Sequence, residues 1–160
     1  MYKNVKAIIF DWGGVCCKEG EPFASQSLQE SLKLTPDEIT DKVKDIHKEY
    51  YVGNHNKNSF WEAVINHFVL PMSAEINPSV LSDAYLNSYE VYQDVLDLIL
   101  QLKQKYNIGL LSDLTPDMKN QIHKKHDLGT YFHTEVYSCD SDVKAKKPDV
   151  KMFQVILEKM

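Results

Sequence analysis

Short apolar runs alternate along the chain with longer segments that have helical periodicity. Three runs, 5–10 (VKAIIF), 107–112 (NIGLLS) and 134–138 (TEVYS), are predicted to be strands. A continuous apolar run, as in the first two, is typical of a strand buried on both faces of a parallel sheet. From residue 107 onward the order is strand, helix, strand, helix, so the pattern predicts an α/β protein.

Capping signals mark the predicted helix starts. Thr35 and Ser59 each begin a four-residue stretch that ends in glutamate, and Asn77 and Thr115 each precede a proline. Such residues satisfy the unpaired amides of a first helical turn. The pattern after Thr35 continues through apolar positions 39, 43 and 46. Asp149 predicts the last start, and the apolar residues of that helix are expected on one face: Val150, Phe153, Ile156 and Met160.

The first two strand-like runs are separated by roughly 90 residues, nearly all with helical patterns, whereas an ordinary crossover is far shorter. This spacing predicts an inserted helical unit over residues 18–90. The α/β core would then consist of residues 1–17 and 91–160.

Polar side chains follow the predicted strands where ligands bind in open parallel sheets, beyond the carboxyl ends of the strands. Asp11 follows the first strand, and Ser112 closes the second. A carboxylate in that position can attack an electrophile or hold a metal ion. The glycines after it, Gly13 and Gly14, allow a sharp turn close to a ligand. The lysines of 144–149 (KAKKPD) could neutralise charge on a transferring group.

Composition narrows the class of protein. A net charge of −5 and a pI near 5.6 argue against a general nucleic-acid binder. The sequence contains no run of 18 apolar residues, so no membrane-spanning helix is expected. Its three cysteines, an odd number, do not form a disulfide framework, which favours reduced thiols and a cytoplasmic protein. All 18 basic side chains other than histidine are lysines.

Four stretches together resemble the haloacid dehalogenase-like hydrolases that carry a helical cap after the first motif. "IIFDWGGV" (8–15) is similar to the first motif of that family, "IGLLSD" (108–113) to the second and "KKPDVKMF" (146–153) to the third. "YYVGNHNKNSFWEAV" (50–64) resembles a cap segment. The resemblance covers the chain in the right order and implies a Rossmann-like parallel sheet with an inserted α-helical cap.

The resemblance also implies an activity, phosphatase action on a small phosphorylated metabolite with Mg²⁺ as cofactor. Asp11 would be the nucleophile that forms an aspartyl-phosphate, and Lys147 would assist it. Asp11 and the Gly13 carbonyl would bind the metal. The residues expected to bind the substrate are Ser112, Asp113 and Gly14.

Three departures from the family pattern accompany these motifs. Gly13 stands where most phosphatases of the family have an aspartate that protonates the leaving group. Lys144 replaces a usual glycine, and Lys146 competes with Lys147 for the role of active lysine. The fourth motif, a strand ending in an acidic pair, does not follow the last helix, so the last core strands are expected to be missing and strand 5–10 to be an open edge. Asp113 and Asp142 are candidates for the metal ligand of that motif.

These departures leave an alternative, in which the chain is a catalytically inactive or truncated domain kept for binding. A haloacid dehalogenase is less favoured. The dehalogenases of the family use arginine to hold the substrate carboxylate and halide, and this sequence contains no arginine.

Overall fold

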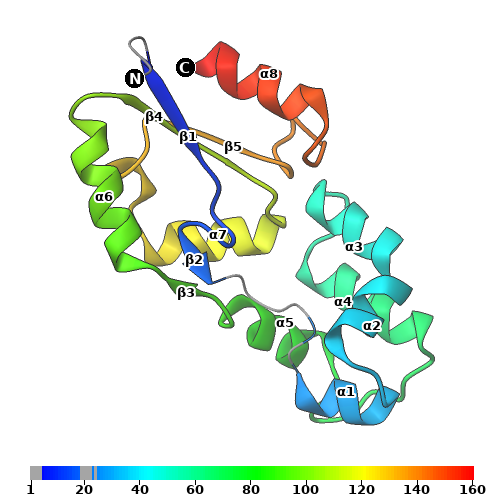
Figure 1. Cartoon of the computed structure of the whole chain (residues 1–160). Helices are drawn as coiled ribbons and strands as arrows, with labels where there is room; N and C mark the ends of the chain where they lie inside the picture. Colours follow the sequence, from blue (N-terminus) through cyan, green and yellow to red (C-terminus); the bar gives the residue numbers. More distant parts are fainter. Residues whose placement is uncertain (1–4, 19–22, 24) are drawn as a thin grey trace.

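A three-stranded parallel sheet forms the centre of the computed structural model, which describes residues 5–18, 23 and 25–160 (Figure 1). Its strands are β1 (Ala7–Phe10), β4 (Asn107–Ser112) and β5 (Thr134–Tyr137), in the order β1-β4-β5. Both pairs are parallel, with Phe10 opposite Leu110 and Ser112 opposite Tyr137. The predicted α/β fold with a parallel sheet is confirmed.

The helices fall into two groups along the chain. Between β1 and β4 lie α1 (Gln26–Leu32), α2 (Pro36–Lys42), α3 (Lys44–Tyr51), α4 (Lys57–His67), α5 (Pro78–Leu86) and α6 (Gln93–Lys103). After β4 come α7 (Pro116–Lys125), a 3₁₀ turn (Leu128–Thr130) and α8 (Val150–Lys159). A small antiparallel pair, β2 (Cys17–Lys18) with β3 (Glu90–Val91), precedes α1 and follows α5.

Most helix starts follow from the capping residues. Thr35 forms the expected capping box with Glu38, and the side chains of Asn77 and Thr115 also accept amides of the first turn. The predicted start at Ser59 is wrong. Helix α4 begins at Lys57, because the Asn56 side chain accepts the backbone N–H of Ser59 and the Ser59 hydroxyl accepts that of Asn56.

One apolar pattern corresponds to two helices. The pattern through positions 39, 43 and 46 is divided at Val43, whose φ of −111° and ψ of 19° separate α2 from α3. Val43 is nevertheless buried, with 1% of its surface exposed. The apolar spacing therefore reports which side chains face the core and not where the helix is interrupted.

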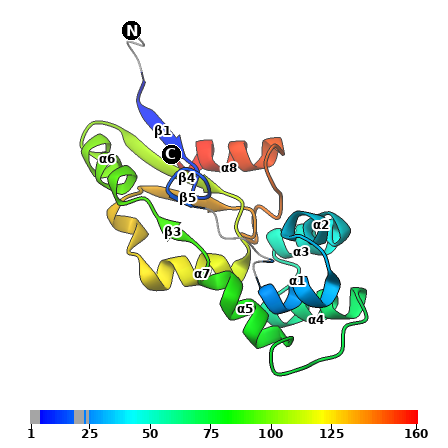
Figure 2. The same cartoon turned by 60° about the horizontal axis from the view of Figure 1, so that its bottom comes forward.

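The sheet is covered on both faces, with α8 on one side and α6 and α7 on the other (Figure 2). Ile108 and Leu110 of β4 belong to the core cluster that includes residues of α6 and α7, whereas Leu111 packs with Met152 and Ile156 of α8. The predicted apolar face of α8 is wrong in part. Its buried stripe runs through positions 152 and 156, while Val150 is 64% and Phe153 42% exposed.

Strand β1 lies at one edge of the sheet, as expected. Within the described residues it pairs with β4 alone, and Ile9 remains 37% exposed. An apolar edge strand with unpaired backbone groups is a template for association with another strand.

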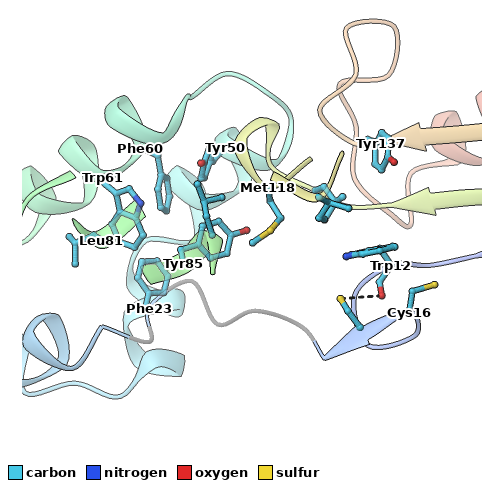
Figure 3. Close-up of a cluster of buried hydrophobic side chains, with 14 of the residues drawn as sticks. Trp12, Cys16, Phe23, Tyr50, Phe60, Trp61, Leu81, Tyr85, Met118 and Tyr137 are labelled. Carbon is cyan, nitrogen blue, oxygen red and sulfur yellow. Dashed lines mark hydrogen bonds between the residues drawn. The ribbon is translucent and has the colours of Figure 1, made fainter. Parts of the chain in front are cut away.

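Aromatic side chains of helices α3–α5 extend the core cluster of the sheet into the helical unit (Figure 3). Phe60 stacks on Tyr50 with ring centroids 4.4 Å apart and makes an edge contact with Trp61 at 5.0 Å. Phe60 and Trp61 are fully buried. Tyr51 of α3 lines a pocket.

Two further features bear on the predictions made from composition. All three cysteines lie in the described part of the chain as thiols and not in disulfides; Cys16 and Cys17 are buried. Burial raises the pKa of the Cys16 thiol to about 12, so it stays protonated and unreactive at neutral pH. Within the described ranges, no helix is long and apolar enough to cross a membrane.

Candidate active site at the end of strand β1

Three side chains predicted from separate motifs meet beyond the carboxyl ends of β1 and β4. The parallel register brings the end of β4 beside Asp11, and the Ser112 hydroxyl donates a hydrogen bond of 2.8 Å to Asp11 Oδ1. Lys147, in the loop before α8, forms an ion pair with Asp11 Oδ2 at 2.5 Å and donates to the Leu111 carbonyl at 3.2 Å. The structure therefore assembles a carboxylate, a hydroxyl and an ammonium group at one point.

A tight turn after β1 holds the Asp11 carboxylate. The backbone N–H of Trp12 donates to Asp11 Oδ1 at 2.8 Å, and the Trp12 carbonyl accepts the backbone N–H of Cys17 at 3.1 Å. Gly14 has a φ of +73°, which glycine adopts without strain, and donates its N–H to the Cys17 carbonyl. Gly14 thus closes the turn but lies outside the described lining of the pocket, whereas Gly13 lines it.

The structure distinguishes the competing lysines by position. Lys147 Nζ reaches Asp11, whereas Lys146 Nζ lies over the ring of Tyr51, 3.9 Å from its centroid. Lys144, in place of the glycine expected from the resemblance, has a φ of +45°. The backbone therefore adopts the left-handed conformation that glycine favours, although the side chain there is lysine.

A pocket of about 150 Å³ opens beside Asp11. Its polar end is formed by Asp11, Gly13, Ser112, Asp113 and Lys147. Its other lining residues are Trp12, Cys17, Tyr51, Tyr85, Tyr89, Leu114 and Met118. The pocket therefore combines the predicted residues with an aromatic and apolar wall that sequence reasoning did not identify.

The two acidic candidates for the fourth-motif ligand lie in different places. Asp113 lines the pocket and accepts the backbone N–H of Lys147 at 3.1 Å; burial raises the pKa of its carboxyl. Asp142 is exposed and paired with Lys159 at 2.9 Å, and this hydrogen bond lowers the pKa of the Asp142 carboxyl. Among the described residues, no group of three or more His, Cys, Asp or Glu side chains could hold a metal ion. Oxygen ligands at the pocket would come from Asp11, Gly13 and Asp113.

Helix α3 is attached to the core next to this pocket. The Tyr50 hydroxyl donates to Asp117 Oδ2 at 2.9 Å, and the Ser138 hydroxyl donates to the Tyr51 carbonyl at 2.7 Å. Gly53, with a φ of +80°, lies so close to Cys139 that a Cβ would be 2.9 Å from its carbonyl oxygen. These contacts place the Tyr51 ring at the pocket.

The fold and the converging side chains define a class of protein, an α/β protein with a carboxylate-centred site at a strand end. The chain belongs to the haloacid dehalogenase-like hydrolase family, whose model matches residues 5–160. The predicted resemblance to this family is confirmed.

Individual relatives are distant in sequence. An uncharacterized protein of Dictyostelium discoideum is 25% identical over 166 residues, which cover 99% of this chain and 68% of that protein. A haloacid dehalogenase family enzyme from Bacteroides thetaiotaomicron is similar with a TM-score of 0.79 and 19% identity, over 98% of this chain and 79% of that one. That enzyme has also been solved in complex with magnesium and inorganic phosphate. A predicted hydrolase of the family from Porphyromonas gingivalis has a TM-score of 0.71 and 18% identity, over 97% and 76% of the two chains.

Proposed function

We propose that this chain hydrolyses phosphate monoesters of small molecules, with Asp11 as the nucleophile. The observation that carries the proposal is the convergence of Ser112 and Lys147 on the two oxygens of the Asp11 carboxylate. In the free protein these donors hold the carboxylate. With a substrate bound, the same hydroxyl and ammonium groups would bond to phosphoryl oxygens and stabilise the charge that develops on them.

The reaction would take two steps. An oxygen of Asp11 attacks phosphorus, and the bond between phosphorus and the ester oxygen breaks; the leaving oxygen keeps the electron pair and takes a proton from water. Water then attacks the phosphorus of the aspartyl-phosphate. This releases inorganic phosphate and restores the carboxylate.

Magnesium fits the polar end of the pocket. Mg²⁺ is usually bound by one or two carboxylates, with water and substrate phosphate completing its shell. Asp11, the Gly13 carbonyl and Asp113 line that end and offer oxygen ligands of this kind. The magnesium and phosphate bound by the Bacteroides enzyme of the same fold support this choice. The ion would neutralise phosphoryl charge, while Asp11 and Lys147 carry out the steps described above.

Gly13 limits the substrates that this site can turn over rapidly. A positioned general acid contributes roughly 10²–10⁴ in rate, and glycine cannot supply one. The enzyme should therefore favour esters whose leaving group departs as a stable anion, such as aryl phosphates. Helices α1–α5 would serve as the cap, since Tyr51 and Tyr85 from this unit line the pocket together with Asp11 and Lys147. The three cysteines, which are thiols and not disulfides, support a reducing, cytoplasmic setting.

Phosphate release from an aryl phosphate, with and without Mg²⁺, tests the proposal. The wild-type chain should release phosphate only with the metal, and Asp11→Asn should abolish the release. Activity that survives this substitution would show that Asp11 is not the nucleophile.

A second candidate, a domain of the family that binds phosphorylated ligands without hydrolysis, is favoured by one observation. Gly13 leaves the pocket without the usual acid next to Asp11. A folded sample that binds inorganic phosphate but hydrolyses no ester would support this alternative. Halide release that is insensitive to EDTA would instead indicate dehalogenation.

A further inference from the structure

The loop that carries the active lysine is tied through its backbone to a side chain at the end of β4. Asp113 Oδ1 accepts the backbone N–H of Lys147 at 3.1 Å. Asp113 directly follows Ser112, the last residue of β4, and is half-buried. The hydrogen bond therefore joins two segments that lie 34 residues apart in sequence and that both contribute to the polar end of the pocket.

Residues 111–113 hold Lys147 at both ends of its side chain. Its Nζ atom donates to the Leu111 carbonyl at 3.2 Å and forms the ion pair with Asp11. Its backbone N–H is bound by Asp113. Leu111 and Asp113 are two positions apart, so the base and the tip of the lysine side chain are bonded to the same short segment. A lysine whose N–H binds Asp113 is thus directed to the Asp11 carboxylate.

The neighbouring lysine is directed elsewhere. Lys146 Nζ lies over the ring of Tyr51, 3.9 Å from its centroid, on the side of the loop that faces α3. For Lys146 to reach Asp11 in the manner of Lys147, its own N–H would have to bind Asp113. The hydrogen bond at position 147 prevents this shift by one residue along the loop.

The hydrogen bond does not depend on the side chain at position 147, because a backbone N–H donates it. A carboxylate acceptor makes such a bond stronger than one between two neutral groups. It should therefore persist when Lys147 is replaced, and Lys146 should remain at Tyr51. This accounts for a site in which one of two adjacent lysines contacts Asp11 and the other cannot take its place.

We propose that Asp113 is a positioning residue, which selects Lys147 over Lys146 as the active lysine by binding the backbone N–H of position 147. The selection is a property of the free protein, but its importance for turnover rests on the proposed phosphatase function. Asp113 performs this role with Oδ1, and the bond does not use Oδ2.

Brief labelling of lysines with acetic anhydride, followed by mass spectrometry, tests the selection without metal or turnover. Lys147 should react slowly in the wild type, because its ammonium group is paired with Asp11 and its side chain is 24% exposed. Asp113→Ala should raise the labelling of Lys147 about 3- to 10-fold, as expected for the loss of one net hydrogen bond. Asp113→Asn keeps a carbonyl acceptor and should leave it within about twofold of the wild-type value.

Asp142→Ala is the matched control for the labelling. Asp142 precedes the same loop, is exposed and pairs with Lys159 at 2.9 Å. The substitution should raise the labelling of Lys159 and leave that of Lys147 unchanged. Such a result would show that the labelling reports the loss of a contact and that Lys147 responds to Asp113 in particular.

Steady-state kinetics with an aryl phosphate and saturating Mg²⁺ test the consequence for hydrolysis. With Asp113 present, Lys147→Met should lower kcat by about 10²–10³, because position 147 stays bound and Lys146 remains at Tyr51. In Asp113→Ala the loop can shift and Lys146 can partly replace Lys147, so Lys147→Met should cost no more than about tenfold. Adding Lys146→Met should restore the full loss. A merely structural role of Asp113 would leave the two losses equal.

The outcomes separate this inference from the proposed function. Unchanged labelling of Lys147 in Asp113→Ala, or an equal rise in Asp113→Ala and Asp113→Asn, would overturn the inference and leave the phosphatase proposal intact. Equal losses of kcat from Lys147→Met in the two backgrounds would do the same. A wild-type chain that hydrolyses nothing would overturn the proposed function, while the labelling would still decide the inference. Should Asp113→Ala fail to fold, Asp113→Leu, which fills similar space without an acceptor, takes its place.

Discussion

Replacing Lys147 with methionine should separate activity from stability. The ion pair that it forms with Asp11 is partly exposed, with 24% of the Lys147 side chain and 37% of the Asp11 side chain accessible. Ion pairs exposed to this extent contribute about 0–1 kcal/mol to folding, because water screens them. Asp11 keeps its hydrogen bonds from Ser112 and from the Trp12 backbone. The melting temperature should therefore fall by no more than about 2–4 °C.

The expected effect on catalysis is much larger. Lys147 is the one cationic side chain among the described residues that line the pocket, so no neighbour can replace it against the charge of a transferring phosphoryl group. Removing one preorganised donor of this kind typically lowers kcat by about 10²–10³, equivalent to about 3–4 kcal/mol. Methionine preserves most of the side-chain length, so the loss would report the charge.

Steady-state hydrolysis of an aryl phosphate with saturating Mg²⁺ provides the assay, with thermal unfolding measured on the same samples. Lys146→Met is the matched control, since Lys146 lies over the Tyr51 ring and not at Asp11. Its kcat should stay within about threefold of the wild-type value, because a partly exposed cation–π contact is worth about 0.5–1 kcal/mol. Equal losses of kcat in the two variants, or a normal kcat for Lys147→Met, would refute the assignment of the active lysine.

Three further predictions concern stability. Burial lowers the pKa of His47 from 6.5 to about 4, so the neutral ring contributes fully to the free energy of unfolding above pH 6.5, and this contribution is lost as the pH falls toward 4. Urea unfolding over this pH range should show a loss of about 3 kcal/mol in the wild type, and the loss should be absent in His47→Phe. Lys144→Gly should raise the free energy of unfolding by about 0.5–1 kcal/mol, because it relieves a φ of +45° at an exposed position, and a decrease would contradict that reasoning. Gly53→Ala should lower it by about 2–4 kcal/mol, because the new Cβ would lie 2.9 Å from the Cys139 carbonyl oxygen at a φ of +80°. Gly129→Ala, whose Cβ would meet nothing closer than 3.5 Å, is the control in thermal melts; similar losses in both variants would count against the steric explanation.

Some residues of the site could be assigned from local sequence patterns, and others could not. Asp11 and Ser112 could be paired from sequence, because parallel strands end at the same edge of a sheet and each residue follows an apolar run. Lys147 could not be separated from Lys146 in this way. Adjacent lysines have the same chemistry, and the loop backbone before α8 decides which one reaches the carboxylate.

No sequence pattern predicted which residues form the aromatic wall of the pocket. The chain contains nine tyrosines, and nothing in the residues around Tyr85 or Tyr89 distinguishes them from the others. Their position depends on how the unit of helices α1–α5 packs against the core. Contacts between residues far apart in sequence establish this packing, such as the hydrogen bond between Tyr50 and Asp117, which are 67 residues apart.

By itself the sequence determined the elements whose causes are local. The strand β4 and the N-termini of α2, α5 and α7 follow from apolar runs and from caps that act within one helical turn. Only the tertiary structure decided the break at Val43, the buried face of α8 and the aromatic wall of the pocket. The physical reason is that backbone hydrogen bonds and caps join residues close in sequence, whereas side-chain packing is set by whichever distant surface each element meets.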